Sequence, residues 1–466
     1  MILQRFEVPG LAHYAYLIGS AGRAAVIDPR RDAGVYTEYA AANDLRITHI
    51  LETHIHADFA SGALELADAT GAELWLSGYD GGEDFQYRFP HHDFCDGEEL
   101  RLGDLRITAL HTPGHTPEHI SILLHDPDRR TQPVALFSGD FVFVGSLGRP
   151  DLLGEQAKHK LAESLFESVQ KKLSELPDSV EIYPAHGAGS MCGSGMAADR
   201  AQSTLGYERK FNPFFLETDK AAFVARILGS VPPFPDYYRR MKRVNSEGPK
   251  IFRGLPGNVP MALDAFQSAI RAEGAAIIDL RPPGDFGAAH IPGAFNIGVG
   301  TNLSTWAAWV VPYDVPLYLV GNDGTEYADA ICSLIRVGLD DVKGYLRGGM
   351  RAWIEAGNAC GKIPQISAGE MQERAAEGAF LVDVRSDGEW QMGHIKGATH
   401  IIGGYLPKRT AELPKDSAIY IICGSGYRSS VAASVLARAG FRDIVNVTGG
   451  MTAWSQQKLP SIRENS

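Results

Sequence analysis

Residues 53–59, which read Thr-His-Ile-His-Ala-Asp-Phe, constrain the fold of this chain more than any other stretch. They come directly after an apolar, strand-like run at 47–51 and directly before a helix-like segment at 62–67. A strand that ends in a His-x-His-x-Asp loop brings two imidazoles and a carboxylate to one point in space. No folding requirement accounts for so many costly polar groups in five positions. The stretch therefore predicts a metal site at the end of a buried strand.

Strand-like runs recur through the first half of the chain, and helical patterns lie between some of them. The runs at 13–18 and 24–28 flank four turn residues, which predicts a hairpin of two mostly buried strands. Other strand-like runs lie at 72–76, 105–110, 120–124 and 134–137. Residues 158–173 carry apolar side chains at helical spacing. Strands in groups with helices outside predict a layered sheet sandwich.

Three more loops with metal donors follow strands in this region. They carry His115 in the Pro/Gly-rich loop 111–119, Asp140 after the run at 134–137, and His186 in the loop 183–187. Together with the 53–59 loop, this order of donors resembles the metallo-β-lactamase superfamily. The resemblance implies an N-terminal αββα sandwich within an α/β protein, and we assign this domain to residues 1–245.

The second half of the chain repeats itself after a predicted connector at 231–243, where prolines precede basic residues. The repeated segments are 277–281 with 381–385, 290–294 with 394–398, and 348–353 with 449–454. Short strands alternate with helices here, which indicates small parallel α/β folds. The repeated phrases resemble rhodanese domains, and we assign two of them to residues 255–358 and 363–462.

One histidine of the two-metal pattern is missing. In a two-metal hydrolase of this superfamily, such as glyoxalase II, the resemblance gives one metal His54, His56 and His115, a bridging Asp140, and a second metal Asp58, a histidine at 59 and His186. Position 59 is Phe in this chain, and a phenyl ring cannot donate to a metal. The second site is one ligand short, which weakens the hydrolase interpretation without excluding it.

A mononuclear site is the alternative. Two histidines and one carboxylate on one face of an ion leave positions open, as in non-haem Fe(II) oxygenases. The persulfide dioxygenases are a branch of the superfamily, and resemblance to them implies a triad of His54, His115 and Asp140. His56, Asp58 and His186 would then orient ligands and water from outside, or serve as alternative ligands. The same donors also suit Zn, so iron is implied by the resemblance alone.

Two residues are candidates for binding the substrate of this site. Arg149 lies in a Gly-Arg-x-Asp ending after Asp140 that resembles persulfide dioxygenases. It either holds the substrate or pairs with Asp151, and both roles are compatible. Cys192 follows His186 by six residues in a Gly/Ser-rich stretch, so it is a hypothetical acceptor of sulfane sulfur. Its alternative interpretation is a small buried apolar residue.

The last domain carries a second reactive motif. A strand-like run ends at Cys423, and the loop Gly424, Ser425, Gly426, Tyr427 and Arg428 leads into a helix. A thiol at a helix N-terminus is stabilised as thiolate, and Arg428 supplies positive charge for an anionic sulfur donor. The six-residue span resembles the active loop of rhodaneses, which carries a persulfide on its cysteine. The middle domain has Gly321 and Glu326 at the aligned positions, so we interpret it as a spacer or docking module.

Composition limits the partners. The net charge of −12 and the pI near 5.7 argue against nucleic acid and anionic membranes. Five scattered cysteines without a repeated spacing fit reduced thiols. The first residues lack the features of a secretory signal, so we expect a cytoplasmic protein. A homo-oligomer is compatible with the sequence.

Together the motifs predict an enzyme of sulfide detoxification. The first domain would oxidise a persulfide of glutathione, coenzyme A or a similar thiol with O2 at mononuclear Fe(II), giving sulfite and thiol. The last would transfer sulfane sulfur through Cys423, and sulfite or thiosulfate enters or leaves according to the direction of flow. Two alternatives stay open: a Zn-dependent thioester hydrolase of glyoxalase II type with an accessory sulfurtransferase, and a sulfur carrier or sensor with a vestigial metal domain.

Overall fold

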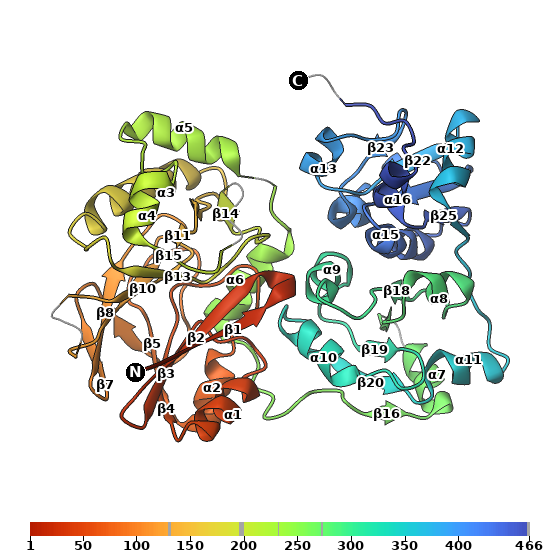
Figure 1. The fold of residues 1–466 in the computed structure, drawn as a ribbon. Coiled ribbons are helices and arrows are strands. Elements are labelled where there is room, and N and C mark those ends of the chain that lie inside the picture. The colour runs from red at the N-terminus through yellow and green to blue at the C-terminus, as the bar shows by residue number, and fades with distance from the viewer. Residues whose placement is uncertain (129–131, 195–199, 232, 272–273, 464–466) are drawn as a thin grey trace. The chain divides into compact units, whose positions relative to one another are not determined.

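The computed structural model describes residues 1–128, 132–194, 200–231, 233–271 and 274–463. The chain divides into two compact units. One unit contains residues 1–254 together with 335–338, and the other contains residues 255–334 and 339–466. In Figure 1 the first unit runs from red to light green and the second from green to blue.

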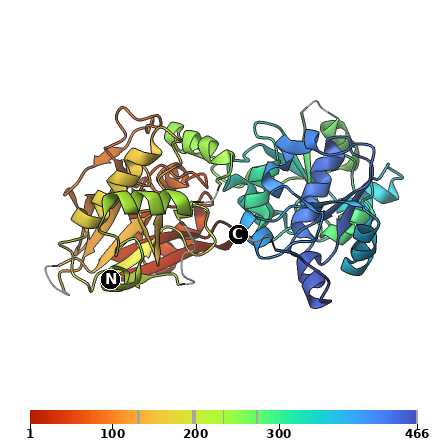
Figure 2. The same cartoon turned by 90° about the horizontal axis from the view of Figure 1, so that it is seen from above.

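Two six-stranded sheets form the centre of the N-terminal unit (Figures 1 and 2). The first has the order β1 (Ile2–Val8), β2 (His13–Ser20), β3 (Arg23–Ile27), β4 (Arg46–Leu51), β5 (Glu73–Ser77) and β6 (His92–Phe94). The second has the order β15 (Ser203–Thr204), β13 (Glu181–Pro184), β10 (Ala135–Gly139), β9 (Ile120–His125), β8 (Leu105–His111) and β7 (Glu99–Leu102). A small third sheet contains β11 (Val142–Phe143), β12 (Ser146–Gly148) and β14 (Gly193–Ser194). The predicted hairpin is the antiparallel pair β2 and β3.

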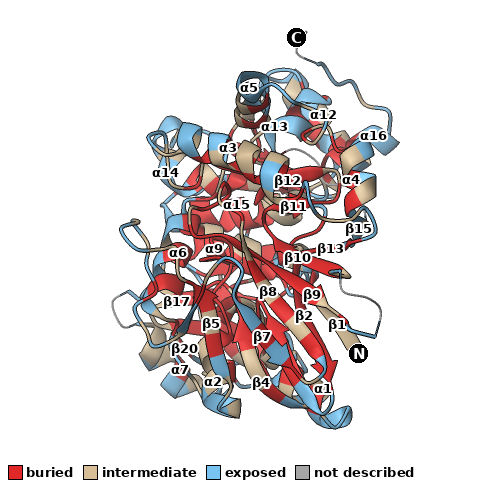
Figure 3. Cartoon of the chain, turned by 90° about the vertical axis from the view of Figure 1, so that its left-hand side faces the viewer, coloured by how far each residue is buried: buried red, intermediate tan, exposed pale blue. Residues whose placement is uncertain are grey.

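The alternation of side chains along the strands creates the layers. In β2, Tyr16 and Ile18 join the apolar cluster between the two sheets, whereas Ala15 and Leu17 join a cluster beneath the helices. This follows because successive side chains of a strand point to opposite faces. The mostly red strands of Figure 3, such as β2, β9 and β10, are therefore buried on both faces.

Helices cover the outer face of each sheet. Next to the first sheet lie α1 (Gly34–Ala42) and α2 (Ala63–Thr70). Next to the second sheet lie α3 (Lys158–Glu167), which continues as the π-helix Ser168–Lys172, then α4 (Leu205–Phe211) and α5 (Lys220–Ser230). The architecture is therefore the αββα sandwich expected from the sequence.

The predicted connector at 231–243 is wrong in its second part. Residues 237–247 form the helix α6 (Tyr237–Glu247) of the N-terminal unit, and six of its side chains are buried. The charged residues of this stretch suggested a solvated linker, but Tyr238, Met241 and Asn245 share one helical face, which packs inward. Pro232 lies outside the described residues.

The C-terminal unit contains two parallel five-stranded sheets with the same strand order. The middle domain has β16 (Pro260–Met261), β20 (Val342–Leu346), β19 (Leu317–Val320), β17 (Ala276–Asp279) and β18 (Phe295–Asn296). The last domain has β21 (Gln365–Ile366), β25 (Ile444–Val447), β24 (Ile419–Ile422), β22 (Phe380–Asp383) and β23 (Thr399–His400). All their pairings are parallel, as the repeated sequence segments predict.

The helices of the two domains also correspond. Those of the middle domain are α7 (Leu263–Ile270), α8 (Pro283–Ala288), α9 (Leu303–Val310), α10 (Tyr327–Ile335) and α11 (Gly349–Glu355). Those of the last domain are α12 (Ala368–Ala376), α13 (Asp387–Gln391), α14 (Leu406–Arg409), α15 (Tyr427–Arg438) and α16 (Gly450–Gln456). Within the described ranges, no helix is both long and apolar enough to cross a bilayer.

The repeated Asp-x-Arg segment has a structural role in both domains. Asp279 and Arg281 form a buried ion pair at 2.6 Å, and Asp383 and Arg385 form the same pair at the same distance. Each arginine also donates to a backbone carbonyl farther along the chain. The pair therefore ties the end of the first long strand to the following helix in each domain.

Candidate metal centre and sulfur-transfer loop

The ends of four strands bring the candidate metal donors together. His54 follows β4, His115 follows β8, Asp140 follows β10 and His186 follows β13. Strands β10 and β13 are parallel neighbours in one sheet, so their carboxyl ends meet at one edge. The facing sheet delivers His54 to the same edge, and the site lies where both sheets end.

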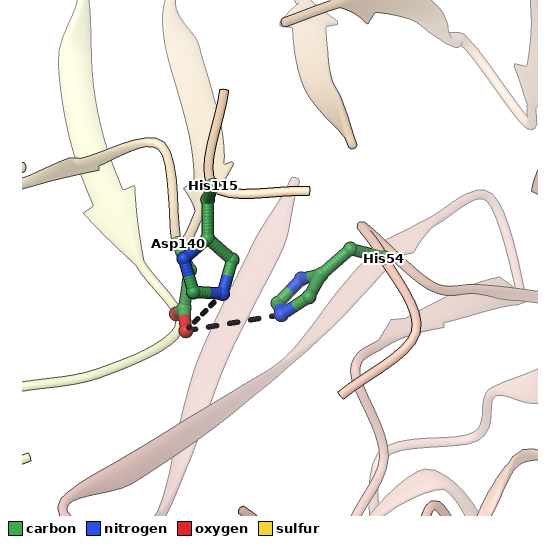
Figure 4. A group of neighbouring side chains, drawn as sticks. All are labelled: His54, His115 and Asp140. Carbon is green, nitrogen blue, oxygen red and sulfur yellow. Dashed lines mark ion pairs between the residues drawn. The ribbon is translucent and has the colours of Figure 1, made fainter. Parts of the chain in front are cut away.

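Three side chains point at one another in the middle of this edge (Figure 4). The Nε2 atom of His54 lies 3.8 Å from Oδ2 of Asp140, and Nε2 of His115 lies 3.5 Å from the same oxygen. All three residues are buried, and one donor atom from each lies within 4.8 Å of the others. The sequence predicted this trio.

The three inward atoms fit a metal ion. Within the described part of the chain, Nε2 of His54, Nε2 of His115 and Oδ2 of Asp140 have no hydrogen-bond partner. A buried polar atom without a partner costs about 1–3 kcal/mol. Three such atoms that converge on one point are costly unless a cation lies between them. Burial, and then neighbouring imidazoles, lowers the pKa of His54 well below its usual value, which favours the neutral ring that donates a lone pair.

The remaining polar atoms of the trio are held in place. Nδ1 of His115 lies 2.8 Å from the backbone oxygen of Arg149, and Nδ1 of His54 lies 3.0 Å from the Thr53 hydroxyl. The Asp140 amide donates to His119 Nε2 at 3.1 Å. Such contacts fix the orientation of potential ligands, so each Nε2 atom keeps its inward direction.

His56 lies beside His54, with ring centroids 4.2 Å apart, and its Nδ1 atom has no hydrogen-bond partner among the described residues. Its Nε2 atom is 3.1 Å from Asp28 Oδ1, and the Asp28 carboxylate also accepts from the amide and hydroxyl of Thr53. Burial opposes protonation of His56, but the Asp28 carboxylate outweighs it and raises the pKa of this imidazole. The sequence did not point to Asp28, which lies 28 residues before His56.

His186, the expected ligand of a second metal, lies between two carboxylates. Its Nδ1 atom lies 2.6 Å from Asp140 Oδ1, and its Nε2 atom lies 2.8 Å from Asp58 Oδ2, so both ring nitrogens are engaged. Burial lowers the pKa of this ring, but the two carboxylates outweigh that effect and raise it well above its usual value. Phe59 fills the adjacent space and packs on His13 and His56, with ring centroids 4.1 and 4.5 Å apart.

Cys192 lies with Asp58 and His186 in a second group of possible donors, and not with the trio. One donor atom each of Cys192, Asp58 and His186 lies within 4.8 Å of the others. The Cys192 thiol is buried and lies 3.7 Å from the Tyr238 hydroxyl. Burial, followed by the charges of Asp58 and Asp140, raises the pKa of the thiol well above its usual value. The sulfur is therefore protonated in this arrangement.

Arg149 is fully buried and makes the internal ion pair that the sequence allowed. Its guanidinium lies 2.7 and 2.8 Å from the two carboxylate oxygens of Asp151 and 3.0 Å from the Met191 carbonyl. The side chain also lies over the Phe234 ring, 5.1 Å from its centroid. Its backbone oxygen holds His115, so the residue is linked to the trio through its main chain.

Helix α6 holds the His54–His56 loop from outside. Lys242 Nζ donates to the Ile55 carbonyl at 2.9 Å. Asn245 donates to the carbonyls of His56 and Phe59 at 2.8 and 2.7 Å, and it accepts from the Ser61 amide at 2.8 Å. Neither residue was expected from the sequence, although their spacing with other buried positions of α6 is typical of an inward helical face.

In the candidate sulfur-transfer loop, the Cys423 sulfur contacts residues of its own loop and of the following helix. Strand β24 ends directly before Cys423, and α15 begins at Tyr427. The Cys423 sulfur is buried, accepts from the Gly426 amide at 3.1 Å and lies 3.4 Å from the Ser429 hydroxyl. Gly426 has φ of 99°, which a residue with a Cβ rarely adopts. Between Cys423 and Gly426, Gly424 is half-buried and Ser425 is exposed.

Arg428 is engaged by a partner that the sequence analysis missed. Its two terminal nitrogens each lie 2.6 Å from one carboxylate oxygen of Glu389, in a bidentate pair. Burial opposes ionisation of Glu389, but Arg428 and the Ser386 amide and hydroxyl outweigh it and lower its pKa to about 2. The carboxylate is therefore charged at neutral pH.

The middle domain contacts the helix that carries this loop. The Tyr427 hydroxyl donates to the Gly298 carbonyl at 3.1 Å, and the Ser430 hydroxyl donates to Asn296 Oδ1 at 2.5 Å. Arg438 donates to the carbonyl of Gly293 farther along α15. The middle domain lacks the thiol, yet it contacts the first turn of α15.

Family comparisons agree with the architecture. Residues 8–186 match the model of the metallo-beta-lactamase superfamily. Residues 262–356 and 367–457 each match the model of the rhodanese-like domain. The fold and the cluster of His54, His115 and Asp140 together imply a divalent metal ion.

Individual proteins are similar to parts of the chain. Hydroxyacylglutathione hydrolase GloC of Haemophilus influenzae is 31% identical over 208 residues, which cover 41% of this chain and 86% of that protein. A hydroxyacylglutathione hydrolase of Methylococcus capsulatus is 34% identical over 190 residues, 40% of this chain and 66% of that protein. A metallo-beta-lactamase structure from Staphylococcus aureus is 34% identical with a TM-score of 0.66, covering 74% of this chain and 99% of that one.

Proposed function

Because the chain belongs to the metallo-β-lactamase superfamily and carries two rhodanese-like domains, we propose that it is a persulfide dioxygenase with a sulfurtransferase. The metal centre would oxidise a small-molecule persulfide, of glutathione, coenzyme A or a similar thiol, with O2. Cys423 would carry sulfane sulfur in a separate step. The combined result is the removal of sulfide as sulfite and thiosulfate.

The observation that carries the proposal is the number of available donors. Two imidazole nitrogens and one carboxylate oxygen converge without partners, whereas both nitrogens of His186 are occupied and position 59 holds a phenyl ring. Asp58, His186 and Cys192 form a second group of possible donors. Because carboxylates already engage both nitrogens of His186, we favour one ion over two. Fe(II) held by two histidines and one carboxylate supplies redox chemistry with O2.

The reaction balances as an oxygenation. One persulfide, one O2 and one water give one thiol and one sulfite with its protons. The sulfane sulfur is oxidised, and O2 is the oxidant. The surrounding residues would exclude bulk water, because the site is lined by buried side chains such as Phe59 and Phe143. Arg149 and Cys192 are our candidates for holding the substrate.

The second step is a sulfur transfer at Cys423. The thiolate attacks the sulfane sulfur of a persulfide, a new S–S bond forms, and the thiol portion leaves with the electron pair of the broken bond. Sulfite then attacks the outer sulfur, and thiosulfate leaves while the Cys423 thiolate is restored. The amide of Gly426 supports the thiolate because it already donates to the sulfur. The reverse sequence, from thiosulfate to a thiol, uses the same atoms.

The second candidate is a Zn-dependent thioester hydrolase with an accessory sulfurtransferase. The names of the similar hydroxyacylglutathione hydrolases favour it. It requires only one bound Zn and an activated water. It does not consume O2, which separates it from the first candidate.

Metal analysis combined with O2 uptake tests the proposal. The chain is purified without air, its metal content is measured, and O2 uptake is followed with glutathione persulfide. We expect iron and rapid uptake, which His115→Ala abolishes. Zinc as the only metal, with no uptake and with thioester hydrolysis, would overturn the dioxygenase.

A cysteine exchange tests the second site. Cys423→Ser should retain O2 uptake and lose thiosulfate formation, since only the sulfur carrier is removed. Cys360→Ser is the matched control because Cys360 is a half-buried cysteine in the loop after α11. Equal thiosulfate yields from both variants would contradict a role for Cys423.

A further inference from the structure

Glu389 forms an ion pair with Arg428, the cationic side chain of the sulfur-transfer loop. Its carboxylate takes both terminal nitrogens of Arg428 at 2.6 Å, in the two-pronged geometry that an oxyanion also prefers. Arg428 is the side chain that the rhodanese-like loop offers to an anionic donor. In this structure a carboxylate of the same chain already holds that place.

The helix start at α13 fixes the Glu389 side chain. Its Oε2 atom accepts from the Ser386 amide at 3.1 Å and from the Ser386 hydroxyl at 2.9 Å, which completes a capping box. The carboxylate is therefore held before any substrate arrives, and it loses little conformational freedom by pairing with Arg428.

The ion pair lies over the loop that carries the nucleophile. A Cβ built on Gly424 would lie 2.8 Å from Arg428 Nη2 and 3.7 Å from Glu389 Oε1. Gly424 directly follows Cys423, whose sulfur is buried beneath the loop. A donor that approaches this sulfur meets Glu389 and Arg428 together, and not an isolated cation.

We propose that Glu389 determines donor specificity by competing with oxyanions for Arg428, an inference that rests on the proposed sulfur transfer. Thiosulfate and sulfite carry their charge on several oxygens, and they must displace the Glu389 carboxylate to use the Arg428 fork. A persulfide of a small thiol presents its charge on one sulfur and has no oxyanion next to the reacting bond. Glu389 therefore disfavours thiosulfate as donor and leaves persulfides as the preferred donors.

The chemical step is the same for both donor classes. The Cys423 thiolate attacks the sulfane sulfur, and one S–S bond forms as another breaks. Sulfite leaves with the electron pair when thiosulfate is the donor, and a thiolate leaves when a persulfide is the donor. Glu389 affects how tightly the donor binds to Arg428. Its substitution should therefore change the KM for the donor more than the rate constant of sulfur transfer.

Glu389→Gln in the full chain tests this inference. A glutamine at this position still completes a capping box, so α13 keeps its start. Transfer to cyanide is measured without O2, once with thiosulfate and once with glutathione persulfide as donor. We expect the KM for thiosulfate to fall about fivefold to tenfold, as for loss of one partly buried charge contact, while the KM for the persulfide changes less than about twofold.

Glu370→Gln is the matched control. Glu370 completes the same capping box with Ser367 at the start of α12, and no arginine of the sulfur-transfer loop pairs with it in the described structure. It should leave both KM values unchanged. Glu389→Asp is the second variant, because it keeps the charge near Arg428 and should keep the high KM for thiosulfate.

Two outcomes would overturn the inference in different ways. An unchanged or raised KM for thiosulfate in Glu389→Gln, or equal changes for both donors, means that Glu389 only positions Arg428. Mass spectrometry of the intact wild-type chain reports the proposed function separately. If neither donor adds a sulfur atom to Cys423, the sulfur transfer itself fails, and this inference fails with it.

Discussion

Removing the Asn245 side chain should loosen the metal loop from a distance. Asn245 lies on α6 and touches none of the three inward donor atoms. It makes three buried hydrogen bonds, to the carbonyls of His56 and Phe59 and from the amide of Ser61. In Asn245→Ala all three backbone groups lose their partner at once.

The magnitude follows from these contacts. A buried hydrogen bond contributes about 1 kcal/mol net, and more when its loss leaves a buried group unpaired. Loss of the three bonds should therefore destabilise the ordered conformation of the loop by about 3–4 kcal/mol. If metal binding requires the ordered loop, this corresponds to a loss of about 100-fold to 1,000-fold in metal affinity. Lys242 still holds the Ile55 carbonyl, so the loop keeps one contact with α6.

The assay is competition between the full-length chain and a chromophoric chelator for Zn(II). Circular dichroism of the apo-protein checks that the variant remains folded. Asn43→Ala is the control, since the Asn43 side chain makes one exposed hydrogen bond, to the Tyr39 carbonyl at the end of α1. Equal zinc affinities of wild type and Asn245→Ala would refute the idea that α6 holds the metal loop.

Three further predictions address the neighbouring features. Phe59→His supplies the missing donor, and zinc per chain after reconstitution should rise from about one to about two; an unchanged ratio would show that more than this ring excludes the second ion. Because Arg428 depresses the pKa of Glu389 to about 2, the stability from this pair is present above pH 4.5 and is lost as pH falls through about 2. Denaturant titrations of wild type and Glu389→Gln should therefore differ by about 1 kcal/mol at neutral pH, after discounting for solvent, and converge in acid. Tyr427→Phe removes the bond to Gly298 and should lower sulfur transfer about threefold to tenfold with O2 uptake unchanged; full transfer activity would rule out bracing by the middle domain.

The sequence predicts that His54, His115 and Asp140 lie together, because each follows the end of a strand. Sheets align the ends of their strands, so a histidine or aspartate directly after a buried strand has a foreseeable place. The same holds for Cys423, whose loop lies between a strand and a helix that its own sequence marks. Phe59, which stands where the two-metal pattern has a histidine, is visible in the sequence alone, and the expectation of a single ion stays a prediction.

The partners of these residues were not foreseeable in the same way. Asn245 and the carbonyl of His56 are 189 residues apart, and only the folded chain brings them together. The prolines and basic residues at 231–243 suggested a connector, and the helical spacing of the apolar side chains in α6 was not used. Glu389 was hidden for a similar reason, since it lies 39 residues before Arg428, and strands β23 and β24 with the short helix α14 come between them. Pairing across elements depends on geometry that a linear pattern does not contain.

Helix α6 decides where this chain can be cut. The region that matches the superfamily model ends at residue 186, yet the side chains of Lys242 and Asn245 hold the metal loop by hydrogen bonds to its carbonyls. A fragment trimmed to the matched region would leave the carbonyls of Ile55, His56 and Phe59 without their partners on α6. An isolated metal domain therefore needs the chain to the end of α6 at Glu247, and an inactive shorter fragment says nothing about the chemistry of the intact enzyme.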